Sequence, residues 1–137
     1  VRPRHRTADD RVDELEPAIS GTRADALLSL SDPMFYANVE RMAAAAIRRR
    51  LPLANNASRR FTAAGFLFSY SVNENEVYRL AATYVDRILR GAKPAEMPIE
   101  QPSRYELVIN QKTAHAIGVT IRRPLLLSAD EVIVRLS

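Results

Sequence analysis

The chain has 137 residues, no cysteine and no tryptophan, and its 20 Lys and Arg against 16 Asp and Glu give a formal net charge of +4. The length fits one domain, and 47% hydrophobic with 26% charged residues is the balance of a folded chain rather than a disordered one. The composition excludes disulfides, thiol nucleophiles and cysteine-bound zinc, and no apolar run approaches the roughly 20 residues that cross a bilayer.

Residues 1–23 form a basic N-terminal segment with one short predicted helix. Val12, Leu15 and Ile19 recur at spacings of three and four, which is typical of an amphipathic helix. Pro17 should kink that helix or end it early. No apolar stretch follows the basic residues at positions 1–6, so this start is not predicted to be a secretory signal peptide.

Short apolar runs predict β-strands at 26–30, 51–54, 66–70 and 105–109. Helices are predicted at 38–50 and 74–90, where apolar residues repeat every three or four positions, and short helices at 58–64 and 111–117, which Gly65 and Gly118 end. Prolines after Gly91 mark an extended connector, and two apolar stretches between 125 and 136 form a small tail. Strands that alternate with helices predict a three-layer α/β fold with a mainly parallel sheet.

Motifs for catalysis are missing from the sequence. The chain has two histidines, His5 and His115, and lacks the zinc-protease, lipase-type and phosphate-loop motifs. Ser69 lacks the flanking glycines of a hydrolase nucleophile, and the adjacent Asp130 and Glu131 would not converge on one proton. We therefore expect no enzyme, no catalytic or metal-binding residue and no cofactor.

Basic clusters at 48–50, 59–60 and 122–123 are compatible with nucleic-acid binding. Acidic residues interleave with them, however, and no nucleic-acid motif accompanies them. Arginines at helix C-termini also interact favourably with the helix dipole. A basic nucleic-acid-binding regulator is therefore the less favoured alternative, and no nucleic-acid partner is expected.

Polar residues follow three of the predicted strands. Ser31 and Asp32 come after the first strand, Asn55 after the second, and Ser69 and Tyr70 at the end of the third. In open α/β sheets, ligands bind at the carboxyl ends of the strands, so these residues are candidates for a small-molecule site with Tyr70 as an aromatic wall. Asp-Pro and Asn-Asn are also ordinary turn formers, and that interpretation stays open.

The order of these segments resembles the substrate-binding proteins of bacterial ABC transporters, in a branch that includes tryptophan- or tyrosine-binding members. The resemblance covers about residues 24–134. It begins with Ala24–Pro33, continues through Phe61–Ser71 and is strongest along Tyr84–Pro94. It implies the C-terminal lobe of a type 1 periplasmic-binding fold over 24–137, in which helix 74–90 and strand 105–110 serve different lobes.

The resemblance further implies a solute-binding transport component with a permease partner and a periplasmic location. The solute would be a small organic molecule such as an amino acid. Apolar surface left where missing units would pack predicts a homo-oligomer. The main alternative is a truncated, ligand-free remnant that only self-associates.

Departures from the family pattern limit what carries over. Phe66 and Ser71 stand where the family usually has glycine, so we expect them to narrow or redirect the cleft. Asn55 and Asn56 stand where relatives often carry an aromatic residue and proline. The family's ligand preference is therefore not carried over, and its residue roles transfer only as cleft-facing candidates: Ser31, Asp32, Asn55, Ser69 and Tyr70.

Overall fold

The computed structural model describes residues 14, 17 and 24–134 of the chain. The helix predicted around Val12, Leu15 and Ile19 lies outside the described residues, apart from residues 14 and 17. The boundary predicted after residue 23 also lies outside them.

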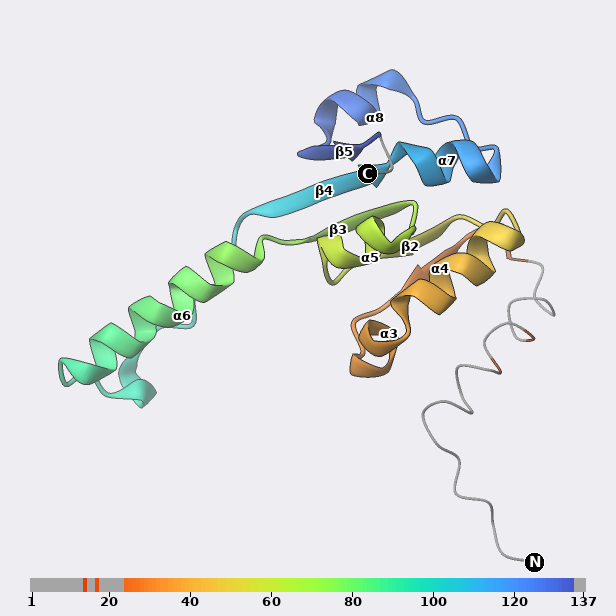
Figure 1. Cartoon of the computed structure of the whole chain (residues 1–137). Helices are drawn as coiled ribbons and strands as arrows, with labels where there is room; N and C mark the ends of the chain where they lie inside the picture. The colour runs from red at the N-terminus through yellow and green to blue at the C-terminus, as the bar shows by residue number, and fades with distance from the viewer. Residues whose placement is uncertain (1–13, 15–16, 18–23, 135–137) are drawn as a thin grey trace, which may run out of the picture.

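The described residues contain one five-stranded sheet whose strands follow the chain order β1-β2-β3-β4-β5 (Figure 1). The strands are β1 (Leu27–Ser29), β2 (Leu53–Asn55), β3 (Phe68–Val72), β4 (Tyr105–Asn110) and β5 (Glu131–Ile133). β1 with β2, β2 with β3 and β4 with β5 are parallel, whereas β3 and β4 are antiparallel. The predicted α/β fold with a mainly parallel sheet is confirmed.

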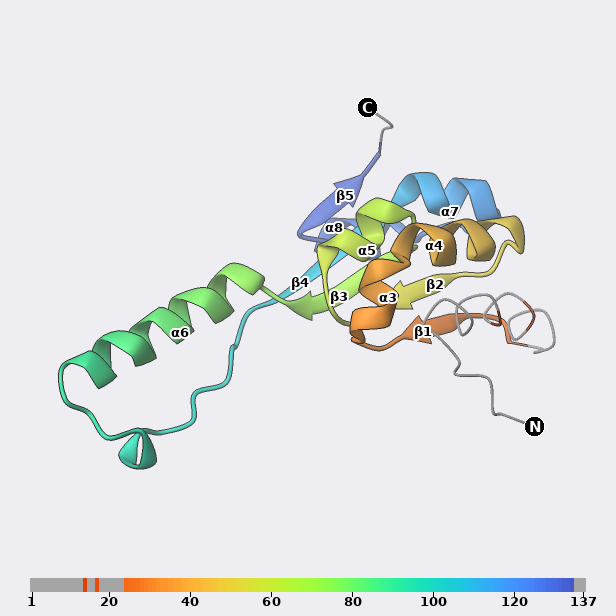
Figure 2. The same ribbon diagram turned by 60° about the horizontal axis from the view of Figure 1, so that its bottom comes forward.

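Helices fill the connections between the strands. They are α3 (Pro33–Ala37), α4 (Val39–Arg48), α5 (Arg59–Ala64), α6 (Glu74–Leu89), the 3-10 helix η1 (Pro94–Glu96), α7 (Gln111–Ile117) and α8 (Arg123–Ser128). α3, α4 and α5 cover one face of the sheet, which we call the helix-covered face (Figures 1 and 2). The other face, the open face, is covered in part by α8 and the segment before it.

The core lies between the sheet and the helix-covered face. Its buried side chains come from α4, β2 and the segment around α5, namely Val39, Met42, Ala43, Ala46, Leu53, Phe61 and Phe66. Two edge-to-face ring pairs order this core: Tyr36 on Phe61 with centroids 4.7 Å apart, and Phe61 on Phe66 at 5.1 Å. The helix-covered face is thus the well-packed side of the sheet.

Local signals explain most helix ends. Asp32, Ser58, Asn73 and Asn110 each precede a helix, and each side-chain oxygen accepts a hydrogen bond from a backbone N–H of the first turn. Gly65 ends α5 with φ +124°, a conformation that favours glycine. A Cβ at Gly65 would also lie 3.1 Å from the Cβ of Ala43.

The structure differs from the predicted elements at four places. β3 starts at Phe68 rather than at 66, because Phe66 is fully buried in the core and its N–H bonds the Phe61 carbonyl to close α5. Residues 33–37 form a helix that was not predicted; Asp32 caps it and Pro33 suits its first position. The connector after Gly91 contains a 3-10 helix, and the apolar tail folds into α8 and β5.

Candidate functional site

Asn55 lies at the carboxyl end of β2, in register with Ser29 of β1 and Ser69 of β3. It is only 1% exposed. Its Nδ2 donates to the Ser29 carbonyl at 3.1 Å, and its Oδ1 accepts from the backbone N–H groups of Ala57 and Ser58 at 2.6 and 3.1 Å. Both ends of the amide are therefore engaged in holding β1 against β2 and shaping the turn into α5.

Ser31 and Asp32 lie in the loop that follows β1. Since β1 and β2 are parallel, this loop shares an edge of the sheet with the turn after Asn55, and we call it the strand-end edge. Asp32 Oδ1 accepts from the Met34 N–H at 2.8 Å and caps α3. Its other oxygen and the exposed Ser31 hydroxyl are available at the surface. The structure thus brings Ser31 and Asp32 to the edge where Asn55 and Asn56 lie.

Ser69 and Tyr70 point to opposite faces of the sheet, because successive side chains of a strand alternate. Ser69 is fully buried on the helix-covered face, and its Oγ has no hydrogen-bond partner among the described residues. Tyr70 is 54% exposed on the open face and stacks on Tyr105, with ring centroids 5.4 Å apart and planes 19° apart. The two residues therefore cannot line one pocket.

Phe66 does not narrow any cleft, contrary to the expectation from sequence. Its ring is fully buried in the core against Phe61. Ser71 is also buried, two residues beyond Ser69 on the same face of β3. Phe66 is therefore used for core packing.

An ion pair that the sequence did not reveal crosses this end of the sheet. Arg59, the first residue of α5, donates two hydrogen bonds of 2.6 Å to the carboxylate of Glu131 on β5. These hydrogen bonds raise the pKa of the Arg59 guanidinium and lower the pKa of the Glu131 carboxyl group. The sequence shows Arg59 only as part of a basic cluster, because 72 residues separate it from Glu131.

α6 and the segment that returns from it to β4 project away from the sheet as an arm (Figures 1 and 2). We define the arm as residues 74–104. Tyr84 ties its two halves together: its hydroxyl donates to the Pro98 carbonyl at 2.6 Å and accepts from the Glu100 N–H at 2.8 Å. Arg87 adds an ion pair with Glu100 at 2.9 Å.

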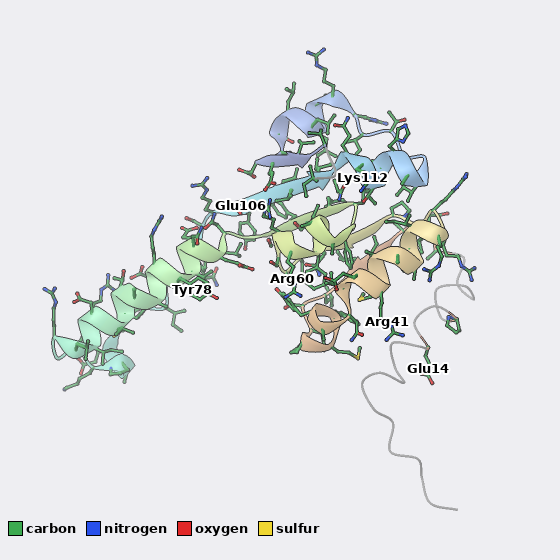
Figure 3. All side chains as sticks on the ribbon, in the orientation of Figure 1. Glu14, Arg41, Arg60, Tyr78, Glu106 and Lys112 are labelled. Atoms are coloured by element: carbon green, nitrogen blue, oxygen red, sulfur yellow. The ribbon has the colours of Figure 1, made fainter. Side chains whose placement is uncertain are left out.

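The arm leaves apolar side chains uncovered. Within α6, which the structure describes in full, no residue is buried. Leu89 is 82% exposed and Ile99 on the returning segment is 94% exposed. Other exposed apolar side chains of α6 are Val77, Tyr78, Val85 and Ile88, of which Figure 3 labels Tyr78.

The open face carries a second apolar surface. Leu28, Phe68 and Tyr70 are exposed there. Beside them, a hollow of about 350 Å³ is lined mainly by apolar side chains of β3, β4 and the segment that leads into α8. This face is therefore incompletely covered by the described residues, although parallel sheets are normally covered on both faces.

The described residues hold no group of three or more His, Cys, Asp or Glu side chains placed to bind a metal ion. Within the same part of the chain, no helix has the length and hydropathy needed to span a membrane.

Comparison with known proteins gives one family and several solved structures. A sequence profile of the ABC transporter substrate binding protein family matches residues 10–133. A conserved domain protein from Vibrio cholerae is 25% identical, with a TM-score of 0.82 over 92% of this chain and 42% of its own. A search of curated proteins gives no match.

Two further structures share the fold. One is an ABC domain from Streptococcus pneumoniae in complex with L-Trp, 23% identical, with a TM-score of 0.82 over 93% of this chain and 42% of its own. The other is a ligand-free, open substrate binding protein with adhesive properties from Clostridium difficile, 15% identical, with a TM-score of 0.66 over 93% of this chain and 41% of its own. The chain thus spans about two fifths of the length of these structures.

Proposed function

Because the chain belongs to the ABC transporter substrate binding protein family, we propose that residues 24–137 form the C-terminal lobe of a two-lobed solute-binding protein, preceded by residues 1–23. A first lobe faces the strand-end edge, and a small organic solute is held between the lobes as they close about a hinge. One observation carries the proposal: α6 leaves the sheet between β3 and β4 with its apolar side chains uncovered.

A helix of this kind needs a partner surface. Most of the stability of an amphipathic helix in a protein comes from packing its apolar face. Val85, Ile88 and Leu89 of the arm are not buried by any of the described residues. A first lobe that covers the arm supplies that packing. The lengths agree, since more than half of each similar structure has no counterpart in this chain.

The solute class follows from the strand-end edge and the family. Ser31 and Asp32 offer a hydroxyl and a carboxylate at this edge, and Asn55 holds the adjacent turn in place. A hydroxyl and a carboxylate suit the ammonium group of an amino acid, and the similar Streptococcus structure contains L-Trp. Of Ser69 and Tyr70, at most one meets the solute, because they lie on opposite faces.

The absence of tryptophan from the chain gives a direct binding assay. When L-Trp is added to the purified chain, all indole emission comes from the solute, so a saturable change in its intensity or anisotropy measures binding. We expect weak binding, because one lobe offers half of a cleft. Asp32→Ser keeps a capping oxygen for α3 but removes the charge, so it should weaken binding with little change in stability. No binding at concentrations on the order of millimolar by a chain shown to be folded would count against the proposal.

Self-association is a second candidate, favoured by the same exposed surfaces. The arm and the open face together leave apolar area that a second copy can cover. This supports a homo-oligomer, which sedimentation velocity at several protein concentrations would detect. A permease partner and a periplasmic location belong to the proposal through family membership, and export of the full-length gene product to the periplasm would test the location.

A further inference from the structure

The arm joins the sheet through two antiparallel segments that run side by side. The β3–β4 ladder ends with Val72 opposite Tyr105. One step further, the backbone N–H of Asn73 donates to the Arg104 carbonyl at 3.0 Å, and α6 begins at the next residue. Backbone pairing between the two segments therefore stops at the base of the arm, which leaves this point free to bend unless side chains brace it.

Glu76 braces the base of the arm. From the first turn of α6, its Oε2 accepts from the backbone N–H of Arg104 at 2.9 Å and its Oε1 accepts from the Ser103 hydroxyl at 3.3 Å. The carboxylate therefore bridges α6 to the segment that returns to β4, directly beyond the end of the ladder.

Asn73 holds Glu76 and the sheet together. Its Oδ1 accepts from the Glu76 N–H at 2.9 Å, which caps α6. Its Nδ2 donates to the carboxylate of Glu106 on β4, a residue that Figure 3 labels. These hydrogen bonds link β4 to Asn73, Asn73 to Glu76, and Glu76 to the segment that returns to β4. They form one network that connects both segments at the base of the arm.

We infer that Glu76 is a positioning residue that fixes the angle at which the arm leaves the sheet. α6 has 16 residues and is about 24 Å long, so a small rotation at its base becomes a large displacement at its far end. The inference rests on the proposed function in one respect: the angle of the arm sets where a first lobe lies over the strand-end edge. The angle itself can be measured without any solute.

The chain has no cysteine, so two introduced cysteines can be spin-labelled without background. Ala44→Cys on α4 and Ala82→Cys on α6 are exposed positions on the body and on the arm, and pulsed electron resonance reports the distance distribution between them. We expect one narrow distribution in the parent and a broad one in Glu76→Ala. Losing a hydrogen bond to a charged acceptor should raise the share of displaced arms roughly tenfold.

Two variants separate bracing from a general effect on α6. Glu76→Gln should restore the narrow distribution, because its amide oxygen can still accept from Arg104 and its amide nitrogen can donate to the Ser103 hydroxyl. Glu74→Ala removes an acidic residue from the same first turn, with the same loss of interaction with the helix dipole. Because Glu74 makes no hydrogen bond or ion pair within the described residues, its variant should match the parent.

A distribution for Glu76→Ala that equals those of the parent and Glu74→Ala would overturn the inference. If Glu76→Ala does not fold, Ser103→Ala removes one contact from the other side, and an unchanged distribution would again overturn it. The solute titration is independent of these distances. A broadened distance distribution for Glu76→Ala, in a protein whose parent chain binds no solute, would uphold the role of Glu76 and contradict the proposed function. Solute binding by the parent together with an unbroadened distribution for Glu76→Ala would uphold the proposed function and contradict the role of Glu76.

Discussion

Replacing Asn55 by alanine should destabilise the fold strongly, although the residue lies in the candidate binding region. The variant leaves the Ser29 carbonyl and the N–H groups of Ala57 and Ser58 without their partner. A buried polar group without a partner costs about 1–3 kcal/mol. Ala57 is partly exposed, so water can replace its bond. The other two groups then set an expected loss of about 3–4 kcal/mol in the free energy of unfolding.

Urea unfolding followed by circular dichroism measures this loss. Asn56→Ala is the matched control, since the neighbouring amide is exposed, and its free energy of unfolding should stay within about 0.5 kcal/mol of the parent. The dependence of the free energy on urea concentration should be unchanged in both variants. A loss below about 1 kcal/mol for Asn55→Ala would refute the interpretation that this side chain organises the strand-end edge.

Three further outcomes are expected. Gly65→Ala should lower the free energy of unfolding by about 2 kcal/mol or more in thermal unfolding, because it combines a positive φ with a contact to Ala43; a loss below about 0.5 kcal/mol would contradict this. The hydrogen bonds from Arg59 lower the pKa of Glu131 in the folded chain, so this pair stabilises the fold at pH values above the ordinary pKa of a glutamate. The contribution is lost as the pH falls through the lower pKa of the folded state. Glu131→Gln should therefore cost at most about 1 kcal/mol at neutral pH, since both side chains are more than a third exposed, and nothing at low pH; an equal cost at both pH values would contradict the assignment. Leu89→Lys should reduce self-association in sedimentation velocity and leave the melting temperature unchanged at concentrations where the parent is monomeric, and a lowered melting temperature under those conditions would show that Leu89 is packed within its own chain.

Local signals made most of the helices predictable from sequence. The spacing of apolar residues located α4 and α6, and Gly65 and Gly118 marked the ends of α5 and α7. The same apolar pattern could not tell a strand start from a core side chain, so Phe66 was assigned to β3. Whether a hydrophobic residue forms part of a strand or packs into the core before the strand begins depends on the helices around it, and the spacing of residues in the sequence does not contain that information.

The candidate site was less predictable. Residues that follow parallel strands share an edge, which correctly brought Ser31 and Asp32 next to the turn at Asn55. Strand alternation could have separated Ser69 from Tyr70, had the limits of β3 been known. The contacts of Arg59 and Glu76 span long sequence separations and depend on the antiparallel return of β4, which no local pattern encodes.

Native mass spectrometry of the purified chain tests most directly whether this lobe binds a solute. It reports the assembly state and any retained small molecule in the same spectrum. The proposed function predicts that the folded chain gains a bound mass of the size of one amino acid when L-Trp or a related amino acid is added. A folded chain that is empty in every assembly state, and stays empty after amino acids are added, would contradict it.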